Sequence, residues 1–367
     1  MRNLLYTVTG LLIIIIAGCH SEQNQKKTPS LKTIFKNDFK VGAAINKRQL
    51  YGKEPGAIAL VKKQFNAISP ENVLKWERIN PAPDSFNFDP ADRYVRFGQE
   101  NDMFILGHNL VWHHQVPEWV FQNKDGTVTD RETLLKRMRQ HISMEAGRYK
   151  GKIDGWDVVN EAVSSDGTLR KSKWMQIIGK EYLPLAYEYA DSAAPDAELY
   201  YNDYDLYKPA KRQGVVKLIK YLQEQGVRID GVGIQGHWGL KVPDLQQVQK
   251  SIDAFAKLGV KVMISELDIT VLSKRGDFNS KDSVDYDPYK NGLPDSVQTQ
   301  LTDRYKAIFR LLHKNRDKIS RVTFWGVNNG DSWLNYTPTT HTNYPLLFNR
   351  DNEPTPAFWG IKNMMSS

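Results

Sequence analysis

The sequence is poor in the features that hold small secreted or fibrous proteins together. Its 367 residues include a single cysteine, Cys19, so no disulfide can form within the chain. It has no internal repeat and no stretch of five or more like charges, although the net charge is +8. A nucleic-acid-binding protein concentrates its charge on one patch, and we therefore expect no nucleic-acid partner. With 40% hydrophobic and 25% charged residues, the composition is that of an ordinary globular protein.

The longest apolar run lies at the N-terminus, from Leu4 to Ile16, behind the positively charged Arg2. This run is shorter than the roughly 20 residues that cross a bilayer and is typical of a signal peptide. The sequence Ile16-Ala17-Gly18-Cys19 resembles the bacterial lipobox, which implies cleavage before Cys19 and a lipid on its thiol. An ordinary signal peptide with an incidental cysteine is the alternative.

These features predict three segments along the chain. Residues 1–18 form the signal peptide, residues 19–33 a polar and flexible tether, and residues 34–367 one folded domain. The lipid would bind the protein to a membrane of the cell envelope, on the periplasmic side or at the cell surface.

Short apolar runs alternate with longer amphipathic stretches after residue 34, and this alternation is typical of a parallel sheet. Residues 131–149 and 210–225 are examples of the expected helices. Eight expected strands and their crossovers fit a (β/α)₈ TIM barrel. A doubly wound sheet has the same alternation, but no Gly-x-Gly-x-x-Gly follows the first strand. The expected strands are Val41–Ile45, Asn66–Ser69, Met103–Leu106, Gly155–Val159, Glu198–Tyr201, Gly231–Ile234, Lys261–Ser265 and Arg321–Trp325.

Polar and aromatic residues gather just after seven of these strands. Because the carboxyl ends of barrel strands open on one face, these side chains should converge there. They are Glu71, Asn72 and Lys75 after the second strand; Gly107, His108, Asn109 and Trp112 after the third; Asn160 and Glu161 after the fourth; Asn202, Asp203 and Tyr204 after the fifth; Gln235 and His237 after the sixth; Glu266 and Asp268 after the seventh; and residues 326–333 after the eighth.

Two carboxylates dominate this set, Glu161 after the fourth strand and Glu266 after the seventh. These strands lie on opposite sides of an eight-stranded ring, so both side chains can lean over its mouth. Glycoside hydrolysis needs such a pair, one protonated and one ionised. His237 and Asp268 can favour the charged form of Glu266, which makes Glu266 the nucleophile and Glu161 the general acid and base. Ion pairing of both carboxylates with Lys or Arg is the structural alternative.

Five motifs in order resemble glycoside hydrolase family 10, the endo-β-1,4-xylanases, over nearly the whole domain. The motifs are Ser69-Pro70-Glu71-Asn72-Val73-Leu74-Lys75-Trp76, Gly107-His108-Asn109-Leu110-Val111-Trp112-His113, Trp156-Asp157-Val158-Val159-Asn160-Glu161-Ala162, Gly233-Ile234-Gln235-Gly236-His237 and Ile264-Ser265-Glu266-Leu267-Asp268. The resemblance implies a retaining hydrolase of xylan and xylo-oligosaccharides that needs no cofactor.

The resemblance also implies a role for each matched position. Glu161 and Glu266 would be catalytic, with Asn160, His237 and Asp268 in support. The sugar would be bound by Glu71, Asn72, Lys75, His108, Trp112, Tyr204, Gln235, Trp325 and Trp333. The family commonly has an Asp where this chain has Asn329, so that carboxylate is either lost or replaced by Asp331.

Two other functions fit the same residues less well. One is a retaining glycosidase for another β-glycan, and the other is a sugar-binding surface lipoprotein without activity. The adjacent His113 and His114 would point to opposite faces of a strand and make a poor chelate, so we expect no metal.

Overall fold

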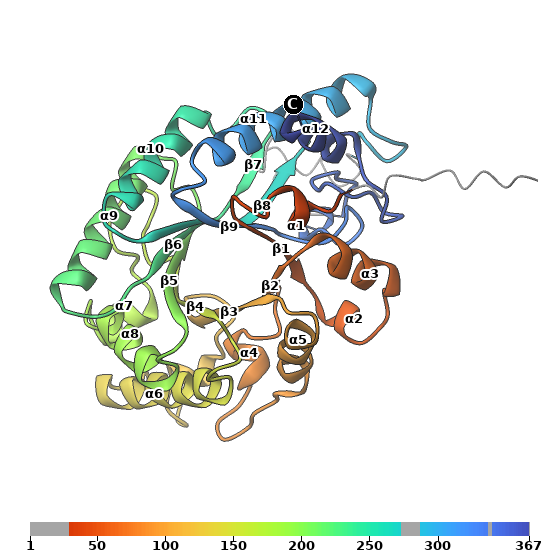
Figure 1. Ribbon diagram of the computed structural model, residues 1–367. Coiled ribbons are helices and arrows are strands. Elements are labelled where there is room, and N and C mark those ends of the chain that lie inside the picture. The colour runs from red at the N-terminus through yellow and green to blue at the C-terminus, as the bar shows by residue number, and fades with distance from the viewer. Residues whose placement is uncertain (1–28, 273–286, 337–339, 367) are drawn as a thin grey trace, which may run out of the picture.

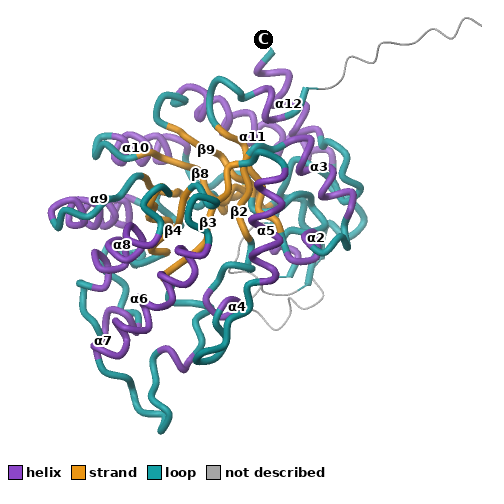
Figure 2. The backbone as a smooth tube through the Cα atoms, turned by 60° about the horizontal axis from the view of Figure 1, so that its bottom comes forward, coloured by secondary structure: helices purple, strands orange, loops and turns teal. Residues whose placement is uncertain are grey.

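Eight parallel strands close into a barrel at the centre of the molecule, and the helices surround it (Figure 1). The computed structural model describes residues 29–272, 287–336 and 340–366. The predicted (β/α)₈ barrel is thereby confirmed. The tube view of Figure 2 shows the strands in the interior and the helices outside them.

The sheet order is β6-β5-β4-β3-β2-β1-β9-β8-β7, and a further pairing of β6 with β8 closes the ring. The additional strand β7 lies outside the ring. Among the described residues it pairs with the C-terminal end of β8 alone, where His237 lies opposite Asp268. The strands are β1 (Lys40–Ile45), β2 (Ala67–Pro70), β3 (Phe104–Val111), β4 (Gly155–Asn160), β5 (Glu198–Asp203), β6 (Gly231–Ile234), β7 (His237–Gly239), β8 (Lys261–Thr270) and β9 (Ile319–Phe324).

The helices present their apolar faces to the outside of the barrel. In α5, for example, Tyr94 and Val95 are buried, and the Tyr94 hydroxyl oxygen lies 2.9 Å from the carbonyl oxygen of Ile68 and 2.7 Å from that of Leu106. The helices are α1 (Leu31–Ile34), α2 (Lys47–Leu50), α3 (Pro55–Gln64), α4 (Trp76–Ile79), α5 (Asp89–Glu100), α6 (Arg131–Arg148), α7 (Lys173–Ile177), α8 (Tyr182–Ala193), α9 (Pro209–Glu224), α10 (Leu245–Ala256), α11 (Asp295–Lys314) and α12 (Pro356–Met365), with 3₁₀ turns at Glu118–Val120 and Trp333–Asn335.

Two strands are longer than the apolar pattern predicts. β3 continues through His108 and Asn109 to Val111, and β8 continues through Glu266 and Asp268 to Thr270. These polar residues are buried although they lie within strands. The predicted strands ended at Leu106 and Ser265, before these polar residues, whereas the mouth of the barrel buries polar groups that bind one another.

The folded domain begins earlier than predicted. Helix α1 starts at Leu31, three residues before the expected boundary at residue 34, and Leu31 is fully buried. Its backbone N–H donates to the side chain of Gln64 at 3.0 Å. Leu31 is therefore part of the core packing rather than of a tether. Cys19 and the expected signal peptide lie outside the described residues, and no helix within the described ranges has the length and apolar character to span a membrane.

Candidate active site

The carboxyl ends of the strands surround an open cavity of about 690 Å³. Glu161 and Glu266 both line it, as predicted from their positions after opposite strands. The structure also brings together every predicted sugar-binding side chain in this lining: Glu71, Asn72, Lys75, His108, Trp112, Tyr204, Gln235, Trp325 and Trp333. Segments far apart in the sequence thus form one polar cleft with aromatic walls.

Glu266 is held by one donor on each carboxyl oxygen. Asn202 Nδ2 donates to Oε1 at 2.8 Å, and His237 Nε2 lies 3.0 Å from Oε2. Burial by itself would raise the pKa of Glu266, but the hydrogen bond from His237 and the charges of nearby histidines outweigh it and leave the pKa below its ordinary value. Glu266 is therefore ionised at neutral pH.

His237 lies between two carboxylates. Its Nδ1 is 2.9 Å from Asp268 Oδ2, an oxygen that also accepts a hydrogen bond from Trp333 Nε1 at 2.8 Å. Burial disfavours the charged imidazole, yet Asp268 and Glu266 together raise the pKa of His237 to about 10. At neutral pH both ring nitrogens therefore carry protons, and each donates to a carboxylate.

Glu161 has a different environment. It follows the last residue of β4, and its Oε1 accepts one hydrogen bond, from the neutral amide of Gln235 at 3.1 Å. Its backbone adopts a positive φ of 58°, which is uncommon for a residue other than glycine. Strained backbone of this kind persists only where neighbours hold it in place, and it is frequent at active sites.

Buried amides connect the two carboxylates. Asn160 lies with its side-chain amide 3.0 Å from Asn202 Nδ2 and 3.3 Å from Gln235 Nε2. Since Asn202 binds Glu266 and Gln235 binds Glu161, the chain of amides fixes the two carboxyl groups relative to each other.

One wall of the cleft carries the residues of the second and third strands. Lys75 is buried, which lowers its pKa, while the carboxylates of Glu266, Glu71 and Glu161 act in the opposite sense. Its ammonium lies 4.9 Å from the centre of the Trp112 ring. Burial likewise raises the pKa of Glu71, against the charge of Lys75. Buried donors and acceptors of this kind can form hydrogen bonds with the hydroxyl groups of a sugar.

Three residues contribute to the site without having been assigned a role from the sequence. Asn202 binds Glu266, and Asp157 holds the ring of His108 at 2.8 Å. Arg170 donates to the carbonyl oxygen of Glu161 at 2.8 Å. Asn202 stood among the polar residues after the fifth strand, and Asp157 within the fourth-strand motif. Arg170 lies in a polar loop whose path no local pattern reveals.

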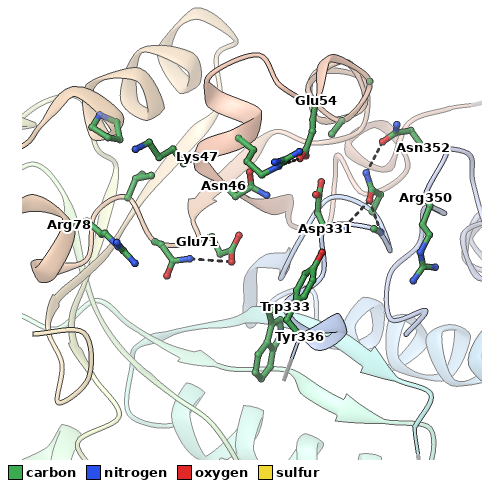
Figure 3. A pocket seen from close by; sticks show the side chains of 18 of the residues that line it. Asn46, Lys47, Glu54, Glu71, Arg78, Asp331, Trp333, Tyr336, Arg350 and Asn352 are labelled. Atoms are coloured by element: carbon green, nitrogen blue, oxygen red, sulfur yellow. Dashed lines mark hydrogen bonds and ion pairs between the residues drawn. The ribbon is translucent and has the colours of Figure 1, made fainter. Parts of the chain in front are cut away.

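Asn329 and Asp331, where the sequence departs from the family pattern, have separate positions. Asn329 is buried and accepts a hydrogen bond from the N–H of Leu346 at 2.8 Å, so it organises its own loop. Asp331 lines a second groove of about 1120 Å³, which adjoins the cleft at Glu71 and Trp333 (Figure 3). There Gln49 Nε2 donates to Asp331 at 2.7 Å.

Asp331 also faces the carboxyl group of Glu54. Burial and the neighbouring Glu54 raise the pKa of Asp331 to about 7. Glu54 is also bound by Arg48 at 2.6 Å, which helps to keep it ionised. Asp331 therefore belongs to the second groove and not to the lining of the cleft that holds Glu161 and Glu266.

The described residues contain no group of three or more His, Cys, Asp or Glu side chains that could hold a metal. The expected orientation of His113 and His114 on opposite faces of a strand was wrong: both follow the end of β3, and their ring centres lie 4.1 Å apart, beside Trp112. Burial lowers the pKa of His113 to about 3, so this ring stays neutral.

A (β/α)₈ barrel with two carboxyl side chains in one polar cleft defines the class as a glycoside hydrolase. Comparison with known proteins identifies the family: the profile of glycosyl hydrolase family 10 matches residues 30–364. The chain belongs to this family.

Several relatives match the chain over almost their entire lengths. Endo-1,4-beta-xylanase A of Xylanibacter ruminicola is 42% identical over 97% of this chain and 98% of its own. An endo-1,4-beta-xylanase of Geobacillus stearothermophilus is 39% identical over 92% and 98%. Among solved structures, a GH10 endoxylanase retrieved from a sugarcane soil metagenome superposes with a TM-score of 0.89 at 42% identity, covering 92% of this chain and all of that one.

Proposed function

We propose that the enzyme hydrolyses internal β-1,4-xylosidic bonds of xylan and xylo-oligosaccharides by double displacement, with retention of anomeric configuration. Its relatives named as endo-1,4-beta-xylanases support the substrate. The observation that carries the mechanism is the unequal environment of the two carboxyl groups. Glu266 accepts from the charged His237 and from Asn202, whereas Glu161 accepts from the neutral Gln235.

In the first step, a carboxylate oxygen of Glu266 attacks the anomeric carbon while the bond to the glycosidic oxygen breaks. Glu161 transfers its proton to that oxygen, and the aglycone half of the chain leaves. Asn160, which lies between both carboxyl groups, is placed to bind the sugar 2-hydroxyl, a contact that strengthens in the transition state.

In the second step, water attacks the anomeric carbon of the glycosyl-enzyme and the bond to Glu266 breaks. Glu161, now ionised, accepts the proton of the water and returns to its initial state. The product therefore has the configuration of the substrate, and no cofactor takes part.

The substrate-binding roles follow from the lining of the cleft. Glu71, Asn72, Lys75, His108, Trp112 and Gln235 would hold the sugars on the non-reducing side of the cleaved bond, with Trp325 and Trp333 as walls beside it. Tyr204 would offer a ring to the aglycone side. Of the three aromatic residues Trp325, Trp333 and Tyr204, Trp325 is the most buried, with 8% of its surface exposed.

Two variants test the mechanism on two substrates. Glu266→Ala should abolish the hydrolysis of both xylan and 2,4-dinitrophenyl β-xylobioside. Glu161→Ala should lower kcat/KM on xylan by about 10²–10⁴ and change it little on the dinitrophenyl glycoside, whose leaving group needs no proton. Wild-type activity on mixed-linkage glucan but not on xylan would refute the substrate, and full xylanase activity in Glu266→Ala would refute the mechanism.

We further propose that Cys19 carries the lipid that anchors the enzyme in the cell envelope. The lipobox-like sequence Ile16-Ala17-Gly18-Cys19 supports this. Fractionation of expressing cells should place the wild type with membranes and Cys19→Ala in the soluble fraction. An unlipidated mature N-terminus in mass spectrometry would contradict the proposal.

A further inference from the structure

The loop that follows β4 folds back on itself and returns to the acid/base residue. Val163 and Leu169 form an isolated antiparallel bridge, and the N–H of Arg170 donates to the carbonyl of Ala162 at 2.7 Å. The turn between them is closed by the N–H of Ser164 on the carbonyl of Thr168 at 2.8 Å. The loop therefore holds Arg170 beside Glu161, although the two are nine positions apart in the sequence.

The tip of this loop rests on helix α9. Gly167 has a positive φ of 86°, and a Cβ atom there would lie 2.4 Å from the carbonyl oxygen of Ala210. Asp166 accepts from the N–H of Thr168 at 2.9 Å and so fixes the turn. The loop is thus braced against the barrel, and Arg170 extends from a rigid support.

The guanidinium of Arg170 spans two elements of the cleft. Its Nε donates to the carbonyl oxygen of Glu161 at 2.8 Å, and its Nη2 donates to the hydroxyl of Tyr204 at 3.0 Å. The N–H of Glu161 meanwhile donates to the carbonyl of Asn202 at 2.9 Å. Both backbone polar groups of the strained Glu161 are therefore bound, the carbonyl by a charged side chain.

Tyr204 is fixed from a second direction. The ammonium of the buried Lys211 lies 3.3 Å from the centre of its ring and 2.7 Å from Asp203 Oδ1. The same carboxylate accepts from the N–H of Tyr204 at 2.9 Å. The ring is thus held by a buried ion pair, and its hydroxyl by Arg170.

We propose that Arg170 is a positioning residue that connects the acid/base Glu161 to the aglycone side of the cleft at Tyr204. The inference rests on the proposed function of Glu161. A leaving group that stacks on Tyr204 would then be aligned with the proton donor Glu161, because the planar guanidinium of Arg170 binds both residues. Lysine, with a single ammonium, cannot make both bonds in this planar geometry.

A positioning role at Glu161 has a kinetic signature that general destabilisation lacks. It affects only steps in which Glu161 transfers a proton. With 2,4-dinitrophenyl β-xylobioside, kcat/KM reports the first step, which needs no acid, whereas kcat includes the second step, in which Glu161 acts as base. With xylan, kcat/KM itself depends on the acid.

The experiment measures kcat and KM of Arg170→Gln on both substrates. Loss of a hydrogen bond from a charged donor should lower kcat/KM on xylan about 10- to 100-fold. On the dinitrophenyl glycoside, kcat/KM should stay within about threefold, while kcat and KM fall together because glycosyl-enzyme accumulates. Arg170→Lys should recover part of the activity on xylan.

Two further variants keep the test decisive. Tyr204→Phe removes only the hydroxyl. It should lower kcat/KM on xylan, relative to kcat/KM on the dinitrophenyl glycoside, by about three- to tenfold, and this test holds even if Arg170→Gln does not fold. Arg137→Gln is the matched control, since Arg137 is also half-buried and donates to backbone carbonyls, those of Trp119, Val120 and Gln122. It should leave both kcat/KM values unchanged.

Equal losses on both substrates, or no loss on either, in Arg170→Gln and Tyr204→Phe would overturn the inference. The wild type separates this outcome from failure of the proposed function. If the unaltered enzyme cleaves neither substrate, the function itself is wrong, whereas normal wild-type rates with unselective variants refute only the role of Arg170.

Discussion

The charge on His237 is the feature of the site that can be perturbed most cleanly. Its pKa is about 10, against 6.5 for an ordinary histidine. At about 1.4 kcal/mol for each pKa unit, this shift means that the site stabilises the imidazolium by roughly 5 kcal/mol. Its side chain is 18% exposed, and the carboxylates of Asp268 and Glu266 oppose the cost of burial. Asp268→Asn removes one of these charges and leaves the shape nearly unchanged.

We expect this substitution to lower the pKa of His237 from about 10 to roughly 8, since two carboxylates share the effect. Above about pH 8 the imidazole of the variant is then mostly neutral. The hydrogen bond from its Nε2 to Glu266 is no longer strengthened by a positive charge. On 2,4-dinitrophenyl β-xylobioside, kcat/KM of Asp268→Asn should be about tenfold below wild type near pH 6 and should fall further above pH 8.

Stability should follow the same ionisation. A histidine whose pKa is raised on folding stabilises the protein fully below its unfolded pKa of about 6.5, and this contribution is lost as the pH rises through about 10. Wild type should therefore exceed Asp268→Asn in free energy of unfolding by about 3 kcal/mol near pH 6, which is two pKa units at about 1.4 kcal/mol each, with the difference shrinking towards pH 10.

The assay combines pH profiles of kcat/KM with urea unfolding, and ¹⁵N NMR of the imidazole gives the pKa directly. Asp38→Asn is the matched control, because Asp38 binds His313 at 2.8 Å outside the cleft. Its pH profile should match wild type. A wild-type His237 that titrates below pH 8, or an Asp268→Asn profile identical to wild type, would refute the reasoning.

Two further predictions concern the surroundings of the site. Gly167→Ala should destabilise the protein by about 1–3 kcal/mol in urea unfolding, because φ is 86° and the new Cβ would meet the carbonyl of Ala210 at 2.4 Å; a wild-type midpoint would contradict the bracing of the loop. Asp331→Asn should raise the melting temperature at pH 8 and change it much less at pH 4, because a carboxyl whose pKa is raised from 3.8 to about 7 costs stability progressively as the pH rises from the lower value, and fully above pH 7. An equal change at both pH values would show that Asp331 does not titrate with Glu54.

Much of the architecture was predictable because it depends on local pattern. All eight barrel strands were located, and Glu161 and Glu266 fell at the mouth because the fourth and seventh strands are opposite in a closed ring. The strand β7 was not predicted. It has only three residues and forms because β8 runs past the barrel and offers an edge at Asp268.

What could not be predicted depends on contacts between distant segments. Arg170 reaches Glu161 because its loop turns at Gly167, where it packs on helix α9. The hydrophobic periodicity of the sequence does not predict this contact. The different positions of Asn329 and Asp331 could not be told apart either, since both are polar residues of one loop. Leu31 follows a mostly polar stretch, and it belongs to the fold because it is buried and its N–H donates to the side chain of Gln64.

The central claim, that Glu266 attacks the sugar and Glu161 handles the proton, is tested most directly by trapping the covalent intermediate. The enzyme is incubated with 2,4-dinitrophenyl 2-deoxy-2-fluoro-β-xylobioside, digested, and analysed by tandem mass spectrometry. One fluoroxylobiosyl group on the peptide that contains Glu266 is the predicted result. A label on Glu161, or turnover of ordinary substrate with no label on any residue, would contradict the account.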